Sequence, residues 1–177
     1  MLLFQHFFAQ PHRQKGEPHF PVRLEGQGCW WDDPQAVPLA ADRGFNVHVV
    51  GEMQFQAEIG SIVGGPCEEG HNCHVPAQLV LAGTERDPDA VGVMINARPV
   101  GWLPPEVALE IMPWIAATQR DGKALTCKAK IVGGWDRGRR DRGFFGVELS
   151  IALPPKVHPD AYGIGARRPR TPAAQGA

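Results

Sequence analysis

The chain has 177 residues, 43% of them hydrophobic, which is enough for one domain with a buried core. Glycine (21 residues) and proline (17 residues) are abundant, and this composition favours a loop-rich β fold over a helical bundle. The formal net charge of −1 excludes a protein that binds nucleic acid through overall charge, but residues 135–177 hold 8 basic and 4 acidic side chains. We therefore expect any phosphate-binding surface in the last quarter of the chain.

The first 44 residues show no sustained hydrophobic period, and prolines interrupt every candidate helix. Trp30 and Trp31 are the strongest apolar anchor here, which indicates an extended arm. The apolar start is too short for a secretory signal and lacks its basic residues. No run approaches the roughly 20 apolar residues that cross a bilayer. We expect a cytoplasmic protein without a membrane partner, whose cysteines are thiols or metal ligands rather than disulfides.

Four elements are predicted in the next part of the chain. Alternation of apolar residues predicts a first core strand over 45–51. Helical spacing of apolar residues predicts a short helix over 53–63, ended by two glycines. A polar loop over 67–74 and a strand over 75–81 follow.

A hairpin and a second helix come next. An Asp- and Pro-rich turn leads into strands over 90–95 and 100–103. Proline is tolerated in the first turn of a helix, so Pro104 and Pro105 predict a helix start, and Asp121-Gly122 predicts its end. The internal Pro113 is expected to kink or weaken this helix.

Two more strands, over 124–135 and 144–153, flank a turn at 136–143. The order of elements predicts a mostly β protein with two helices, an α+β fold built on a small, OB-like, partly open β-barrel. We expect three parts: an N-terminal arm (1–44), the barrel domain (45–153) and a disordered basic tail (154–177). In the tail, three arginines would add non-specific attraction to nucleic acid: Arg167, Arg168 and Arg170.

Three short motifs carry a resemblance to a known family. They are Val49-Val50-Gly51, Asp87-Pro88-Asp89-Ala90-Val91 and Val100-Gly101-Trp102-Leu103. Together they resemble the core signature of the HIRAN domain, a small β-barrel that binds ends of single-stranded DNA and also occurs as a free-standing bacterial or phage protein. The Ile-Val-Gly-Gly-Trp string ending at Trp135 resembles a bacterial branch of the family. The resemblance covers about residues 47–153.

This resemblance implies a pocket for a DNA end. Phe55 would stack on a terminal base, or it belongs to the core. Asp87 matches a family carboxylate that contacts a 3′-hydroxyl, or it bonds backbone N–H groups of its own turn. Arg86 stands where the family has an aromatic residue, and it would stack on a base, bind a phosphate or remain a solvated charge. Trp102 would line the same groove or pack in the core.

The turn at 136–143 is the second candidate site. It carries four arginines against two aspartates, a net charge of +2 on a glycine-rich tip, which suits contacts with backbone phosphates. In the alternative interpretation, the alternating Asp and Arg side chains pair with each other. The candidate phosphate contacts are Arg137, Arg139, Arg140 and Arg142.

A cluster of cysteine and histidine residues offers a third candidate site. Four zinc-ligand types fall within eight residues, but structural zinc sites usually draw ligand pairs from two separate segments. A variable loop between strands is the alternative, and we expect no cofactor unless this loop binds zinc. The candidate ligands are Cys67, His71, Cys73 and His74. Cys127 is expected in the core.

No catalytic motif emerges from the sequence. The expected function is a non-catalytic module that binds single-stranded or 3′-end-containing DNA in repair, replication or mobile-element biology. The alternative is a protein-interaction or targeting adaptor that kept the barrel and lost the end pocket. Three residues favour this alternative because they stand where the family has stacking aromatic residues: Met53, Gln54 and Arg86. A metal-dependent regulator that uses the Cys67–His74 loop is a third hypothesis.

Overall fold

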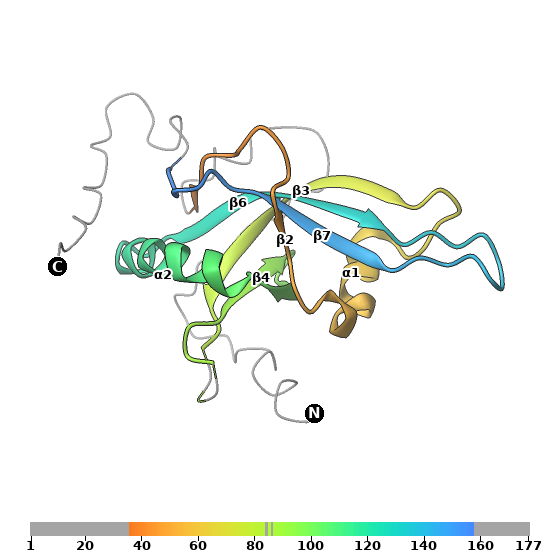
Figure 1. Cartoon of the computed structure of the whole chain (residues 1–177), viewed down its shortest axis with the longest axis horizontal. Coiled ribbons are helices and arrows are strands. Elements are labelled where there is room, and N and C mark those ends of the chain that lie inside the picture. The colour runs from red at the N-terminus through yellow and green to blue at the C-terminus, as the bar shows by residue number, and fades with distance from the viewer. Residues whose placement is uncertain (1–35, 84, 86, 158–177) are drawn as a thin grey trace.

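The computed structural model describes residues 36–83, 85 and 87–157. They form a curled sheet of antiparallel strands, joined by one short parallel pair, with two α-helices (Figure 1). The expected fold class is confirmed: the protein is mostly β with two helices, and the sheet makes an OB-like, partly open barrel. None of the helices that the structure describes is long and apolar enough to cross a membrane.

The sheet has seven strands: β1 (Ala36–Pro38), β2 (Val47–His48), β3 (His71–Leu81), β4 (Val91–Ile95), β5 (Arg98–Trp102), β6 (Ala124–Gly133) and β7 (Phe145–Ser150). Their order is β2-β7-β6-β3-β4-β5, and β1 pairs in parallel with β6. The helical elements are the 3-10 helix η1 (Glu52–Gln54), α1 (Gln56–Val63) and α2 (Pro105–Arg120).

The long strands β3 and β6 form the centre of the sheet, and their alternating residues build the core. On β6, Cys127, Ala129 and Ile131 are fully buried, whereas Lys128 and Lys130 are partly exposed. Complete burial raises the pKa of the Cys127 thiol to about 12, as expected for a core cysteine. The helices α1 and α2 lie near opposite ends of the long strands (Figure 1).

The chain enters the sheet earlier than the expected domain boundary at residue 45. β1 pairs with residues 124–126 of β6. This part of β6 is available to β1 because β7 pairs only with residues 128–133 of β6. All three residues of β1 and the following Leu39 are buried. At the other end, Val157 forms a bridge with Leu39. The rest of the expected arm and tail, including the tryptophans at 30 and 31 and the arginines at 167, 168 and 170, lies outside the described residues.

Several predicted elements differ in detail from the structure. The strand predicted over 45–51 is reduced to β2, and the helix predicted over 53–63 is divided between η1 and α1. β3 begins at His71, inside the predicted polar loop, because His71–Cys73 pair with the last residues of β6. α2 continues through Pro113, which lies on its exposed side.

Candidate functional site

The two ends of the sheet meet at one place, which we call the seam. The backbone N–H of Val50, just after β2, donates to the carbonyl of Trp102 at the end of β5 (2.8 Å). The N–H of Trp102 donates back to the carbonyl of Val50 (2.9 Å). This single antiparallel bridge joins the first and last strands of the sheet order. It therefore brings two of the three sequence motifs side by side, the one that contains Val50 and the one that contains Trp102.

Two glycines explain why the chain can approach so closely at the seam. A Cβ on Gly101 would lie 2.6 Å from the Val50 carbonyl oxygen, so any side chain there would push the two segments apart. Gly51 has a φ of 80°, and a Cβ on it would lie 2.6 Å from the indole ring of Trp102. Both glycine positions of the motifs therefore serve the packing of Trp102 against the end of β2.

A pocket of about 330 Å³ opens beside the seam, and we call it the end pocket. Its walls come from the seam, from η1, from the turn before β4 and from the first turns of α2. The lining residues are Val50, Gln54, Asp87, Asp89, Ala90, Trp102, Leu103, Pro105, Ala108 and Leu109.

The structure brings two of the four predicted end-binding residues into this pocket. Asp87 and Trp102 both line it, although 15 positions separate them in the sequence. Phe55 is only 8% exposed and belongs to the core, where its ring packs against the Trp102 ring with centroids 5.0 Å apart. Phe55 therefore supports the pocket from inside. Arg86 lies outside the described residues.

The chemistry of the end pocket is acidic and apolar. Of the described residues that line it, Asp87 and Asp89 carry negative charge and none carries positive charge. The rim is apolar, because Leu109 is 58% exposed and Val50 is 42% exposed. Such a pocket favours a neutral group that donates hydrogen bonds over an anion such as a phosphate.

The sequence interpretation missed Asp89 and Leu109 as pocket residues. Asp89 lies two residues from Asp87 in the same turn, and this closeness in the sequence could have identified it as a second pocket residue. Leu109 lies on the exposed side of α2, outside the apolar face that the helical spacing picks out. The sequence pattern of the helix alone therefore could not show that this exposed side lies next to the turn before β4.

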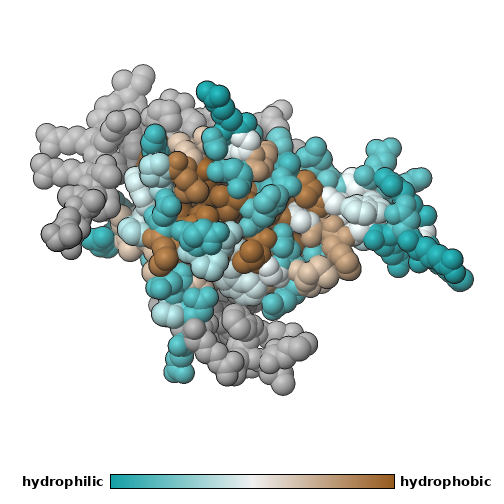
Figure 2. Space-filling view, viewed as in Figure 1, coloured by the Kyte–Doolittle hydropathy of each residue, from teal (hydrophilic) through white to brown (hydrophobic). Residues whose placement is uncertain are grey.

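The arginine hairpin, residues 136–143, projects from the sheet between β6 and β7 as a hydrophilic protrusion (Figures 1 and 2). The alternative interpretation, in which its charges pair internally, holds for two of the four arginines. Arg142 donates to Asp136 (3.0 Å), and Arg137 lies 3.6 Å from Asp141. Arg139 and Arg140 are exposed and have no acidic partner among the described residues.

The pairing inside the hairpin fixes its base. The backbone N–H of Gly138 and the side chain of Arg142 both donate to Asp136, and together they lower the pKa of that carboxyl group. The indole N–H of Trp135 donates to Asp141 (2.8 Å), and the Arg137 side chain donates to the Glu68 carbonyl (3.0 Å). Arg137 and Arg142 are thus engaged within the hairpin although their side chains stay exposed, whereas the tip arginines have no ion pair among the described residues.

The four candidate zinc ligands are not gathered at one point. Cys67 lies before β3 and its thiol donates to the Gly70 carbonyl, whereas His71 and Cys73 lie on one face of β3 and His74 on the other. His74 packs against Phe45 (5.1 Å between centroids), and burial together with Lys128 and Lys130 lowers its pKa. In the part of the chain that the structure describes, no group of three or more His, Cys, Asp or Glu side chains is placed to hold a metal ion.

Comparison with protein-family models, with curated proteins and with solved structures found no match to this chain.

Proposed function

We propose that this protein is a non-catalytic, HIRAN-like module that binds the 3′ end of single-stranded DNA in the end pocket. One observation carries the proposal: the seam and the turn before β4 place Asp87 and Trp102 in the same pocket. A carboxylate can accept a hydrogen bond from a free hydroxyl, and an aromatic ring can stack on a base. The hydrogen bond to the hydroxyl is the contact that distinguishes the 3′ end of a strand from its interior, because internal bases also stack.

The charge of the pocket favours a free hydroxyl over a terminal phosphate. Asp87 and Asp89 would repel a 3′-phosphate, whereas the sugar and base of an unphosphorylated end carry no charge. Phosphates further along the strand would bind elsewhere, and the accessible Arg139 and Arg140 of the arginine hairpin are suited to them.

The test is fluorescence anisotropy with short single-stranded oligonucleotides that end in a 3′-hydroxyl or a 3′-phosphate. We expect the wild-type protein to prefer the free hydroxyl by about 10-fold, because a hydrogen bond to a charged group contributes about 1.5–3 kcal/mol. Asp87→Asn should reduce this preference to less than about 3-fold, since the amide neither repels the phosphate nor accepts the hydroxyl as strongly.

Asp121→Asn is the matched control, because Asp121 is exposed at the end of α2 and does not line the pocket. This variant should keep the wild-type preference. Equal binding of both ends by the wild-type protein, or an unchanged preference in Asp87→Asn, would contradict the proposal.

A peptide-binding adaptor is the second candidate function, and the apolar rim of the pocket favours it. Leu109 and Val50 are exposed beside two carboxylates, an arrangement that also suits a peptide with one basic and one apolar side chain. The same anisotropy experiment separates the two functions, because an adaptor would bind none of the oligonucleotides even at low salt.

A further inference from the structure

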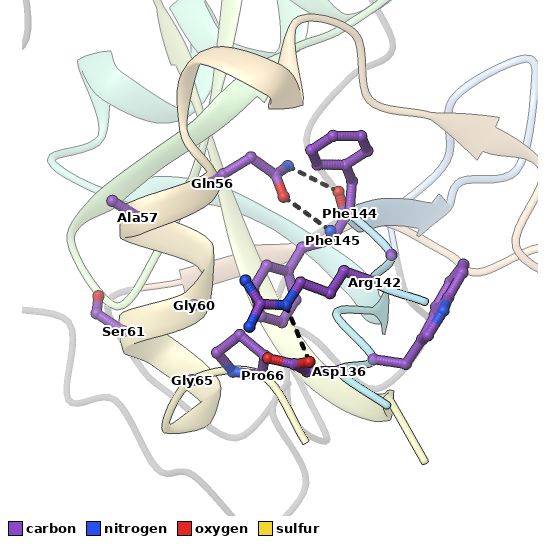
Figure 3. Close-up of a pocket in the computed structure, with 12 residues that line it drawn as sticks. Gln56, Ala57, Gly60, Ser61, Gly65, Pro66, Asp136, Arg142, Phe144 and Phe145 are labelled. Carbon is purple, nitrogen blue, oxygen red and sulfur yellow. Dashed lines mark hydrogen bonds and ion pairs between the residues drawn. The ribbon is translucent and has the colours of Figure 1, made fainter. Parts of the chain in front are cut away.

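A second cavity, larger than the end pocket, lies between α1 and the base of the arginine hairpin, and we call it the hairpin cleft. Its volume is about 540 Å³, within the range of small-ligand sites. One wall is the face of α1 that carries Ala57, Gly60 and Ser61. The opposite wall carries Arg142 and Phe144 (Figure 3). Trp135 also lines the cleft.

The floor of the cleft is held in place by the amide of Gln56. This side chain donates to the carbonyl of Phe145 (2.9 Å) and accepts from its N–H (2.8 Å), as a neighbouring strand would (Figure 3). On the inner side, a Cβ on Gly60 would lie 3.2 Å from the Phe145 ring, so helix and strand pack closely. The cleft is therefore formed by rigid elements, with no ligand needed to shape it.

The side chains at the cleft suit a flat ring. Phe144 is 66% exposed, the highest fraction among the large hydrophobic residues that the structure describes. Arg142 extends across the cleft toward α1, and its hydrogen bond to Asp136 uses Nε, so the other two nitrogens of the guanidinium group are not needed for that bond (Figure 3). Aromatic and guanidinium faces are the two surfaces on which nucleobases stack in proteins that bind single strands.

The surrounding charge indicates what else the ligand carries. The hairpin has four arginines and two aspartates, and the accessible pair, Arg139 and Arg140, extends beyond the cleft. A ligand with a flat ring at the cleft and negative charge toward the hairpin tip matches this arrangement. A nucleotide within a strand has both features.

The two cavities flank a single segment of chain. Gln54 at the end of η1 lines the end pocket, and Gln56 at the start of α1 lines the hairpin cleft. We propose that the hairpin cleft is a second base-binding subsite, which stacks an internal nucleobase of the single strand whose 3′ end lies in the end pocket. This inference rests on the proposed function, and it defines the path of the strand across the η1–α1 segment toward the arginine hairpin.

The experiment uses 2-aminopurine, a fluorescent base whose emission falls when it stacks. It is placed at the first, second, third or fourth position from the 3′-hydroxyl of an oligothymidylate. With the wild-type protein we expect quenching at the first position and at one internal position. Phe144→Ala should abolish the internal quenching, keep the terminal quenching, and weaken binding of the longer oligonucleotides at least about 5-fold.

Two further variants make the outcome unambiguous. Leu81→Ala removes another exposed apolar side chain (42% exposed) that lines neither cavity, and it should bind like the wild-type protein. Asp87→Asn should lose the preference for the free end while it keeps the internal quenching. Because Phe144 is largely exposed, its replacement leaves the core intact.

Each failure has its own signature. End-dependent binding with quenching only at the first position, or internal quenching that persists in Phe144→Ala, would overturn the second subsite and leave the end pocket standing. Absence of oligonucleotide binding by the wild-type protein would overturn the proposed function and this inference together.

Discussion

Asn96 and Ala97 form the two-residue turn of the β4–β5 hairpin, and both have positive φ (55° and 57°). This backbone conformation matches the twist of a hairpin, and Asn-Gly is its preferred sequence. Alanine in this conformation costs roughly 1–2 kcal/mol, because its Cβ crowds the following carbonyl group. Ala97 is therefore a strained residue in a turn that holds β5, and with it Trp102, in place.

We predict that Ala97→Gly stabilises the protein by about 0.5–1 kcal/mol. Glycine removes the backbone strain, but it also raises the conformational entropy of the unfolded chain, which offsets part of this stabilisation. Thermal or urea unfolding measures the difference. Ala116→Gly, inside α2, is the control and should destabilise the protein by about 1 kcal/mol. A loss of stability in Ala97→Gly comparable to that in Ala116→Gly would contradict this account of the turn.

The arginine hairpin combines two arginines that form ion pairs with two arginines that form none among the described residues. Arg137 and Arg142 hold the shape of the hairpin through Asp141 and Asp136, so their replacement would change structure and charge together. Arg139 and Arg140 have no acidic partner among the described residues and can be replaced without that complication.

We predict that the double variant Arg139→Gln/Arg140→Gln has a shallower plot of the logarithm of the association constant against the logarithm of salt concentration. The magnitude of the slope should fall by about 1.4, because each lost phosphate contact on a single strand contributes about 0.7. Its preference for a free 3′-hydroxyl should stay unchanged. Arg120→Gln/Lys123→Gln, at the end of α2, is the charge-matched control. A salt dependence equal in the two double variants would place the phosphate contacts away from the hairpin.

Hydrophobic periodicity predicted most elements of this chain, and the exceptions have physical reasons. The strands predicted over 90–95 and 100–103 correspond to β4 and β5, and the helix predicted from Pro104-Pro105 to Asp121-Gly122 corresponds to α2, which buries the predicted apolar face. The start of β3 was missed because His71–Cys73 pair with β6 at the extended end of the sheet, where the side chains are half-exposed or exposed and show no apolar alternation. β1 has only three residues and depends on the edge of β6 that β7 leaves unpaired.

For the whole molecule, the order of elements was sufficient to predict a partly open barrel with two helices, but not the way in which its ends meet. The seam depends on a bridge between Val50 and Trp102, residues far apart in the sequence, and on two glycines that permit the contact. Asp87 and Trp102 could be chosen from the sequence through the family resemblance. For Phe55, burial in the core was one of two alternatives that the sequence left open, and the hairpin cleft was not predicted, because both depend on how α1 packs against β5 and β7.

The proposed function places the end of a single strand in the pocket beside the seam. It is tested by titrating the isotopically labelled protein with a short 3′-hydroxyl oligonucleotide and following two-dimensional nitrogen–proton NMR spectra. We expect the largest changes at the indole N–H of Trp102 and at the backbone amides of Asp87, Asp89 and Ala90, and smaller changes at Cys127 in the core. Saturable changes confined to other surfaces, with the signals of Trp102, Asp87, Asp89 and Ala90 unmoved, would contradict the proposed function.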